Sequence, residues 1–441
     1  MVGSLPLALT KLGLEAEIYL PWYQGIEAKH IGDIEYLFAG QPEAGALGEA
    51  WHRGVRVVLL GHPDFQRERL YGYPDDVARF MRFSCMAYQA ASGAGILHAH
   101  DWHAGLVPVL AHAAGGRQKT VFTIHNLAYQ GRWNPGEFLA WSGLPAHYLQ
   151  LEGLEYRGDA SLMKGGIVYA HRVTTVSPSY AREILTPEFG EGLEGLLQKH
   201  QHKLRGILNG IDTSYWDPST DPHLPSRYSA NDLSGKTACR AALRTETGFN
   251  QEGVVLGVVS RLVEQKGMDQ VLEILPPLLR LGCKLVVLGS GEPALEDSFR
   301  LAGEKYQGQV FFRSGHNEAL AHRIYAGADA LLIPSRFEPC GLTQMIAMRY
   351  GTPPIARAVG GLKDTIRDGV TGVLYSGGQS ANLLAAIERF LRLDQQAMRL
   401  AGMRENFSWE YPALEYAAVY GELSTSRVGL TEEPNSPGQR E

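Results

Sequence analysis

Short apolar runs alternate with segments of helical period along the chain, and this pattern predicts an α/β protein. In the second half, runs of strand character cover 254–260, 284–288, 310–313, 330–333, 354–356 and 373–375. Helical segments lie between them, for example over 268–281 and 319–326. In the first half we expect strands at 17–20, 55–60, 172–176 and 204–208, and a helix over 77–91. Strands that alternate with helices favour a parallel, doubly wound sheet.

The length of the chain indicates more than one domain. A chain of 441 residues is too long for one compact core, so we expect two domains of about 200 residues each. The segment 214–231, rich in Pro, Ser and Asp, carries little periodicity, and we place the connection at 210–225. The predicted division is an N-terminal domain over 1–212, a C-terminal domain over 213–400, closing helices over 401–424 and a disordered tail over 425–441.

Composition narrows the class of protein. Hydrophobic residues at 44% and charged residues at 20% fit an ordinary globular enzyme. The net charge of -6, with no Lys/Arg-rich run, argues against a nucleic-acid partner. The 4 cysteines lack metal-ligand spacing and indicate reduced thiols. Since the sequence shows neither a bilayer-spanning run nor a signal peptide, we expect a cytoplasmic protein without a membrane partner.

The stretch from Pro334 to Gln344 has the features of a ligand-binding turn. An apolar run over 330–333 leads into it, and an apolar helical segment over 342–350 leaves it. Glu338 would lie at the carboxyl end of a parallel strand beside the free N–H groups of a helix start, where a sugar and a phosphate can be held together. Gly341 would let the backbone approach a ligand closely. On the residues alone, Glu338 could equally cap the helix.

Two further loops follow predicted strands of the second half. Arg261 and Lys266 suit a diphosphate that gains charge as its bond to a sugar breaks, although surface cations on a solvated loop are commoner. We find no Asp-x-Asp pair beside them and expect no metal. The N–H groups near Gly360 and Gly361 could bind phosphate, but a plain turn also fits. The segment 289–294 formally matches a dinucleotide fingerprint, yet no acid ends the next strand, so we reject a nicotinamide cofactor.

Histidines gather where two predicted strands of the first half end. His98, His100 and His103 follow one apolar run, and His125 follows the next. Because open parallel sheets place ligands at these strand ends, the four side chains suggest one wall of a cleft. They lack the spacing of a tight metal site, and the first three could be wholly structural.

Several motifs in order then resemble the bacterial glycogen synthase and starch synthase family. Besides the stretch 334–344, these are His-Ala-His-Asp-Trp-His-Ala-Gly-Leu (98–106), Thr-Ile-His-Asn-Leu-Ala-Tyr-Gln-Gly (123–131), Val-Ser-Pro-Ser-Tyr-Ala-Arg-Glu-Ile (176–184), Leu-Asn-Gly-Ile-Asp (208–212), Ser-Arg-Leu-Val-Glu-Gln-Lys-Gly (260–267) and Gly-Gly-Leu-Lys-Asp-Thr (360–365). The resemblance covers nearly the whole chain. It implies two Rossmann-like domains that face a cleft (the GT-B fold), with the last helix returning to the first domain. It also implies transfer of glucose from ADP-glucose to the non-reducing end of an α-1,4-glucan, with retention and without a cofactor.

The resemblance further implies a role for each residue that matches a family motif. Arg261 and Lys266 would neutralise the departing diphosphate, and Glu338 would hold the donor glucose near the reacting carbon. His125 would contact that sugar and support the charge that develops on it. The remaining residues expected at the donor are Asp101, Asn126, Tyr71, Asn209, His316, Cys340, Gly341, Leu342, Thr343, Gly360 and Gly361.

The chain departs from the family pattern in two places. Related retaining transferases often carry a second glutamate eight positions after the first, where this chain has Ile346, so Glu338 is the single acid expected there. The family also begins with a strand and a Lys-x-Gly-Gly-Leu loop, and Met1 aligns just after that loop. We therefore expect the first strand of domain 1 to be missing. As written, the chain should be poorly stable and nearly inactive, and an added strand and loop should restore both properties.

Three alternatives remain at the level of sequence. The chain could be an inactive glucan-binding fragment, or a related transferase that uses UDP-glucose. A glycan phosphorylase with pyridoxal phosphate is a further alternative, but we do not find the lysine context that this cofactor uses.

Overall fold

The computed structural model describes residues 1–425, which form two compact units. The first unit consists of residues 1–174, 196–207 and the chain from 410, and the second of 175–195 and 208–409. The structure thus divides the chain differently from the predicted limits in three places: the segments 175–195 and 208–212 belong to the second unit, and of the closing helices only the last belongs to the first. The predicted tail lies, from residue 426 on, outside the described residues.

Strands and helices alternate through most of the chain, as the pattern predicts, but the strands between residues 17 and 61 follow one another directly. Up to residue 206 they are α1 (Leu5–Lys11), β1 (Glu17–Pro21), β2 (Lys29–Phe38), β3 (Gln41–His52), β4 (Val55–Gly61), η1 (Pro63–Phe65), α2 (Asp76–Ala90), β5 (Ile96–His100), η2 (Trp102–Ala104), α3 (Leu106–Ala113), β6 (Lys119–Ile124), β7 (Arg132–Trp133), α4 (Pro135–Ser142), η3 (Ala146–Tyr148), β8 (Glu155–Tyr156), β9 (Asp159–Ser161), α5 (Leu162–Tyr169), β10 (Arg172–Thr175), α6 (Pro178–Glu183), α7 (Glu194–Lys199), η4 (Gln201–Lys203) and β11 (Leu204–Gly206). After it come α8 (Ser234–Thr247), β12 (Val255–Val259), η5 (Glu264–Lys266), α9 (Met268–Glu273), α10 (Leu275–Arg280), β13 (Lys284–Gly289), α11 (Pro293–Lys305), β14 (Val310–Ser314), α12 (Glu318–Gly327), β15 (Ala330–Ile333), α13 (Thr343–Arg349), β16 (Pro354–Arg357), α14 (Gly360–Thr365), β17 (Val373–Tyr375), α15 (Ser380–Arg392), α16 (Gln395–Met403) and α17 (Glu410–Thr425).

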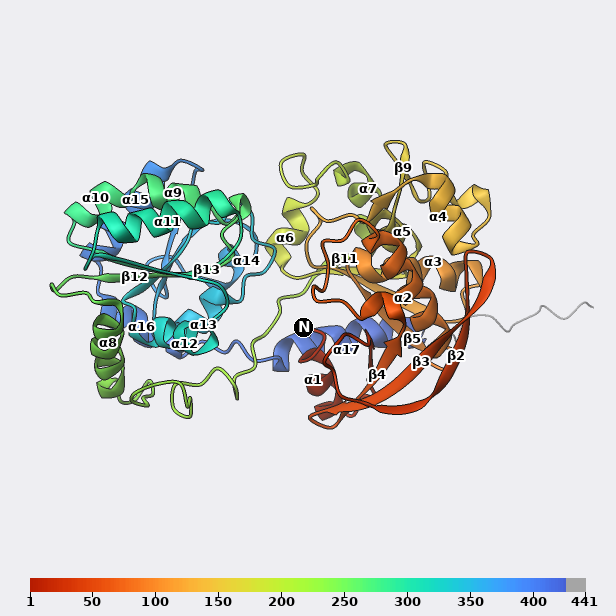
Figure 1. Ribbon diagram of the computed structural model, residues 1–441, viewed down its shortest axis with the longest axis horizontal. Coiled ribbons are helices and arrows are strands. Elements are labelled where there is room, and N and C mark those ends of the chain that lie inside the picture. Colours follow the sequence, from red (N-terminus) through yellow and green to blue (C-terminus); the bar gives the residue numbers. More distant parts are fainter. Residues whose placement is uncertain (426–441) are drawn as a thin grey trace, which may run out of the picture. The chain divides into compact units, whose positions relative to one another are not determined.

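The second unit is a doubly wound α/β domain. Its sheet has the order β14-β13-β12-β15-β16-β17, and all neighbouring strands are parallel. Helices α9, α11 and α15 cover one face, and α8, α12 and α13 cover the other (Figure 1). Successive strand residues alternate between two cores: Leu331 and Ile333 join the core under α12 and α13, whereas Leu332 joins the core under α9 and α15. This double burial explains why the strands read as continuous apolar runs.

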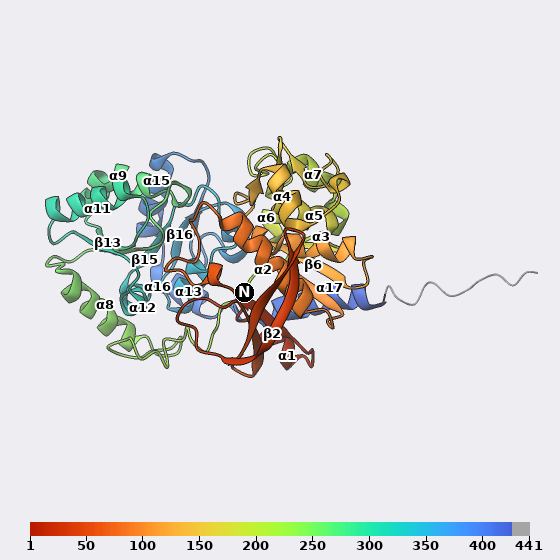
Figure 2. The same ribbon diagram turned by 45° about the vertical axis from the view of Figure 1, so that its right-hand side comes forward.

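The first unit contains parallel strands and a hairpin that the pattern of apolar runs did not predict. Strands β5 and β6 are parallel within the sheet β11-β10-β6-β5, and β1 is parallel to β4 in the sheet β1-β4-β3-β2. Strands β2 and β3 form a long antiparallel hairpin that continues into β4 (Figure 2). Its turn has positive φ at Ala39 (52°) and Gly40 (71°), as in a tight hairpin loop. The α/β prediction is confirmed, but this sheet is mixed rather than parallel. That an opening strand is missing stays a prediction.

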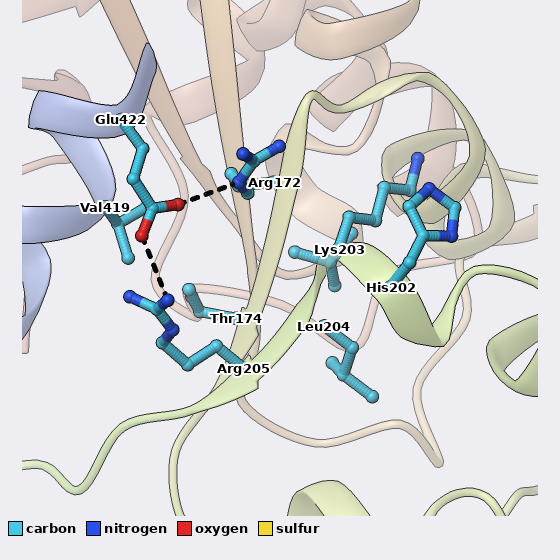
Figure 3. Close-up of a pocket in the computed structure, with 9 residues that line it drawn as sticks. Arg172, Thr174, His202, Lys203, Leu204, Arg205, Val419 and Glu422 are labelled. Carbon is cyan, nitrogen blue, oxygen red and sulfur yellow. Dashed lines mark hydrogen bonds and ion pairs between the residues drawn. The ribbon is translucent and has the colours of Figure 1, made fainter.

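Helix α17 is the last described element and belongs to the first unit. Its Glu422 carboxylate accepts from Arg172 Nε at 3.2 Å and from Arg205 Nη2 at 3.0 Å (Figure 3). Its Tyr420 hydroxyl lies 2.7 Å from Nδ1 of His98 on β5. The helix is therefore fastened to strands from three separate parts of the chain.

Two further findings concern the cysteines and the helices. All four cysteines are buried and unpaired. Across residues 1–425, no helix combines the length and the apolarity that crossing a membrane requires.

Candidate functional site

The predicted donor residues of the second unit gather where the order of its strands reverses. From β12 the chain proceeds outward to β13 and β14, then returns to β15 on the other side of β12. The loop with Arg261 and Lys266 follows β12, and the stretch 334–344 follows β15. In open α/β sheets the connections diverge at such a point and leave a crevice for a ligand.

A cation and a carboxylate meet in this place. Lys266 Nζ lies 2.5 Å from Oε2 of Glu338, whose residue is only 7% exposed. The hydroxyl of Ser335 donates to the same oxygen at 2.9 Å. Glu338 does not cap α13, because the N-cap of that helix is Leu342 and no side chain caps it. The carboxylate is therefore paired with a cation and held in one position, as a group that must face a reacting carbon needs to be.

Glycines bring three backbone segments together around this carboxylate. The N–H of Gly361 donates to the carbonyl of Glu338 at 3.0 Å. A Cβ on Gly360, which has φ of +44°, would lie 2.0 Å from that carbonyl oxygen, and a Cβ on Gly361 would lie 2.2 Å from the carbonyl oxygen of Cys340. A Cβ on Gly267 would meet the carbonyl oxygen of Pro334 at 2.1 Å. Only glycine permits this packing of the loops after β12, β15 and β16.

A buried glutamine fixes the turn that follows Glu338. Gln344 donates through Nε2 to the carbonyls of Cys340 (3.0 Å) and Gly341 (2.8 Å) and to Oγ1 of Thr365 (3.0 Å). Gly341 has φ of +72°, and Thr343 begins α13. Leu342 is 43% exposed, so its side chain is not part of the core. The backbone from 341 to 343 is thus rigid, with its N–H groups at the start of a helix.

The other predicted donor residues of the second unit have fewer hydrogen bonds that fix their side chains. Arg261 is exposed, with Nη2 3.5 Å from Oε1 of Gln265, and His316 is exposed after β14. The Oδ1 atom of Asn209 is buried and has no hydrogen-bond donor within residues 1–425. Burial raises the pKa of the Cys340 thiol to about 12, so it stays protonated. Among these, only Asn209 offers an unmet buried acceptor that a ligand could satisfy.

In the first unit, Asp101 is a strained residue between β5 and η2. Its φ of 56° and ψ of 179° are unusual for a residue with a side chain. Its Oδ1 accepts the N–H groups of His125 at 2.7 Å and of Asn126 at 3.3 Å. Burial raises the pKa of Asp101 to about 7, although these two N–H donors act in the opposite direction. Asp101 therefore fixes the backbone of the turn that carries His125.

His125 lies in a group of histidines that hydrogen bonds tie together. Its Nε2 is 3.2 Å from Nδ1 of His100. His98 binds Oγ1 of Thr123 through Nε2 at 2.6 Å. Burial lowers the pKa of His98 and of His125 to about 3, and that of His100 well below its usual value. All three imidazoles are thus neutral near pH 7. No cluster within residues 1–425 has the composition of a metal site.

Because the pKa values of the three buried histidines are low, we expect the protein to lose stability in acid. In the unfolded chain a histidine takes up a proton near pH 6.5, whereas these folded pKa values lie lower, so the unfolded state binds more protons as the pH falls. The contribution of these neutral histidines to stability is therefore fully present above the pKa of the unfolded chain, and it is lost as the pH falls towards 3. The cost should be on the order of 1–2 kcal/mol per histidine at pH 5. We expect the melting temperature to fall between pH 8 and pH 5, and less steeply in His98→Gln. The exposed His52→Gln should follow the wild type, and a flat profile would contradict the burial argument.

Asn126 and Tyr71, the two remaining predicted donor residues of the first unit, differ in their contacts. Asn126 accepts the N–H of Ala128 at 3.1 Å and so shapes its own turn. Tyr71 is 61% exposed and makes no hydrogen bond within residues 1–425. Its neighbour Tyr73 is anchored instead: its ring lies 5.4 Å from the guanidinium carbon of Arg79, and its hydroxyl accepts the N–H of Arg69.

Sequence reasoning missed several residues that shape the site. Ser335 and Gln344 stood inside the recognised stretch, but nothing local indicated that their side chains turn towards Glu338 and Thr365. Tyr73 differs from Tyr71 only by position in a Tyr-Gly-Tyr run. The polar pattern did mark His100, whose partner became clear only in the folded unit.

Comparisons with known proteins agree with this geometry. Residues 1–199 match the model of the starch synthase catalytic domain, and residues 240–406 match that of the glycosyl transferases group 1. A glycogen synthase of Thermus thermophilus is 51% identical over 422 residues, which cover 96% of this chain and 94% of the relative. The glycogen synthase of Deinococcus deserti is 46% identical over 439 residues, or 96% of this chain and 95% of the relative. The chain belongs to the glycogen synthase and starch synthase family.

A solved structure extends the family likeness to three dimensions. The catalytic domain of starch synthase IV from Arabidopsis thaliana, bound to ADP and acarbose, superposes with a TM-score of 0.90 at 34% identity, covering 96% of this chain and 95% of that one. Sucrose-phosphate synthase from Thermosynechococcus elongatus shares the fold, with a TM-score of 0.62 at 20% identity, 96% coverage of this chain and 92% of that one. This member of the family is a glycosyltransferase with the GT-B fold.

Proposed function

We propose that the protein transfers glucose from ADP-glucose to the non-reducing end of an α-1,4-glucan, with retention at the anomeric carbon. Membership of the glycogen synthase family establishes glucosyl transfer in glycogen or starch synthesis. The choice of ADP is supported by the related starch synthase, whose structure contains ADP. The observation that carries the proposal is the Lys266–Glu338 pair at the reversal of strand order.

The proposed roles follow from charge. As the bond between the sugar and the diphosphate breaks, negative charge grows on the leaving group, and Arg261 and Lys266 stabilise it. Lys266 is already in place because Glu338 holds it. Glu338 in turn holds the donor glucose near the reacting carbon. The backbone N–H groups of 341–343 bind phosphate and sugar hydroxyls, helped by Asn209 and Cys340, and His316 lies near the base. The N–H groups of Gly360 and Gly361, which we also expected to bind phosphate, instead donate to the carboxylate of Glu183 and to the carbonyl of Glu338, so these two glycines contribute through their close packing.

In the first unit, the neutral imidazole of His125 contacts the donor sugar and supports the positive charge that develops on it. A neutral ring can do so through a hydrogen bond without adding a repelling charge. Asp101 fixes the backbone on which His125 stands. Asn126 and Tyr71 complete the donor contacts of this unit.

The deciding experiment is transfer of labelled glucose to glycogen from ADP-glucose and from UDP-glucose in parallel. We expect transfer from ADP-glucose to be the faster, and the product to be degraded by an enzyme that cleaves only α-1,4 bonds. Faster transfer from UDP-glucose would overturn the choice of donor. Binding of glycogen without transfer from either donor would support an inactive glucan-binding protein instead.

The same assay tests how the leaving group is stabilised. Because Arg261 and Lys266 supply positive charge at the diphosphate, we expect activity to be unchanged in excess EDTA. Arg261→Ala should lower turnover by about 10²-fold, the scale seen when one charge-stabilising group is removed. Loss of activity in EDTA that Mg²⁺ or Mn²⁺ restores would show that a metal, rather than these side chains, carries the charge.

A further inference from the structure

His125 has only one hydrogen-bond partner for its ring within residues 1–425, and that partner is His100. The contact joins Nε2 of His125 to Nδ1 of His100 at 3.2 Å. A neutral imidazole carries one N–H and one bare nitrogen, so only one hydrogen can lie between the two rings. Whichever ring donates it, the contact decides whether the other nitrogen of His125, Nδ1, is a donor or an acceptor.

The ring of His100 packs in turn against another histidine. It lies against the ring of His98, with centroids 4.2 Å apart. Both nitrogens of His98 are occupied, Nδ1 by the hydroxyl of Tyr420 at 2.7 Å and Nε2 by Oγ1 of Thr123 at 2.6 Å. Thr123 continues to Oγ1 of Thr174, also at 2.6 Å. A row of short contacts thus leads from α17 through β5 to the ring of His125.

We propose that His100 is a positioning residue for glucosyl transfer, because its Nδ1 selects the tautomer of His125 and orients that ring, and that Tyr420 of α17 secures His100 through His98. The inference rests on the proposed function, in which His125 touches the donor sugar. It gives a role to His98 and His100 of the His-Ala-His-Asp motif, neither of which has a role in the proposed function. It also connects the last helix of the chain to the turn that carries His125.

The test compares variants of the full chain in the glucosyl-transfer assay. His100→Ala should lower kcat by about 10²-fold with little change in KM, since a misplaced catalytic group costs about that much. His100→Asn should recover at least tenfold of this loss, because its amide can present either a donor or an acceptor near the place of Nδ1. Tyr420→Phe, which removes only the hydroxyl, should lower kcat severalfold.

A matched control is available in the same unit. The hydroxyl of Tyr148 lies 3.1 Å from Nδ1 of His112, the same kind of pair as Tyr420 with His98 but in a separate group of residues. Tyr148→Phe should therefore leave kcat unchanged while lowering the melting temperature about as much as Tyr420→Phe. If both variants lower kcat equally, the effect of Tyr420 is general destabilisation, and its part in the proposal is wrong.

Nitrogen NMR of the imidazole of His125 reads the tautomer without any assay. We expect one tautomer in the wild type and in His100→Asn, and a mixture in His100→Ala. A single unchanged tautomer in His100→Ala, or normal kcat in His100→Ala where His125→Ala is inactive, would overturn the inference and leave the proposed function standing. Normal kcat in His125→Ala would instead remove His125 from the mechanism and His100 with it.

Discussion

Replacing Glu338 with alanine is expected to lower turnover by about 10²-fold or more. The carboxylate is nearly buried and is bound to Lys266 at 2.5 Å and to the hydroxyl of Ser335, and in the proposed mechanism it holds the donor glucose. Its loss should cost about 1.5–3 kcal/mol of stability, the scale of a hydrogen bond to a charged group, because Lys266 and Ser335 lose their partner. The measurements are kcat in the transfer assay and the melting temperature.

Two further variants separate charge from general damage. Glu338→Gln keeps the size of the side chain and removes its charge, and should be impaired almost as strongly as the alanine variant. Glu246→Ala removes a carboxylate from another ion pair of the same unit, with Arg323 at 2.7 Å, and should keep normal turnover. Near-normal kcat in Glu338→Ala together with a much lower melting temperature would show that the pair with Lys266 is structural.

Gly360→Ala is expected to impair both folding and catalysis. The new Cβ would lie 2.0 Å from the carbonyl oxygen of Glu338, and the positive φ of +44° adds strain that glycine avoids. The Cβ is attached to the backbone of one loop and meets the backbone carbonyl of the other, so no flexible side chain can move aside. The loops after β15 and β16 must therefore separate. Overpacking of this kind costs about 1–3 kcal/mol. Because the carbonyl belongs to Glu338, we also expect kcat to fall at least tenfold.

Gly282→Ala provides the matched control for this prediction. Gly282 also has a positive φ, of +80°, but a Cβ there would meet nothing within 4 Å. It should therefore lose only the conformational term, about 1 kcal/mol, and keep full activity. Equal losses in the two variants would mean that backbone strain alone explains Gly360, and that the close approach to Glu338 has no separate effect.

The second unit could be predicted from sequence almost strand by strand. Its strands are buried on both faces, so each one is a bare apolar run bounded by glycine or polar residues, and β15 and β17 have the predicted limits. The loops that carry Arg261, Lys266 and Glu338 follow such strands directly. Their approach to one another follows from the order of the strands, because a doubly wound sheet brings β12 and β15 side by side.

The first unit was harder because part of its information is not local. Strand β2 is half-exposed, and its signal is an alternation, with Ile34, Tyr36 and Phe38 buried between exposed neighbours. The buried residues of β3 are the glycines Gly45 and Gly48, which give no apolar signal. A search for continuous apolar runs passes over such a pattern. Likewise, Tyr71 and Tyr73 stand in the same motif, and only the arginines packed against the ring of Tyr73 distinguish the two. The linking of His98 to Tyr420 joins residues more than 300 positions apart, which no local pattern reveals.

The interleaving of the two units has a consequence for synthesis on the ribosome. The second unit is complete in sequence at residue 409, whereas the first still lacks α17 at that moment. His98 on β5 and Tyr420 are separated by 322 residues. At the usual elongation rates of about 5–20 residues per second, the synthesis of that stretch takes roughly 16–64 seconds. During that interval the unit translated first is the one left unfinished. A nascent chain that stalls at residue 409 would carry a complete second unit and an incomplete first one, so chaperones should engage its N-terminal part.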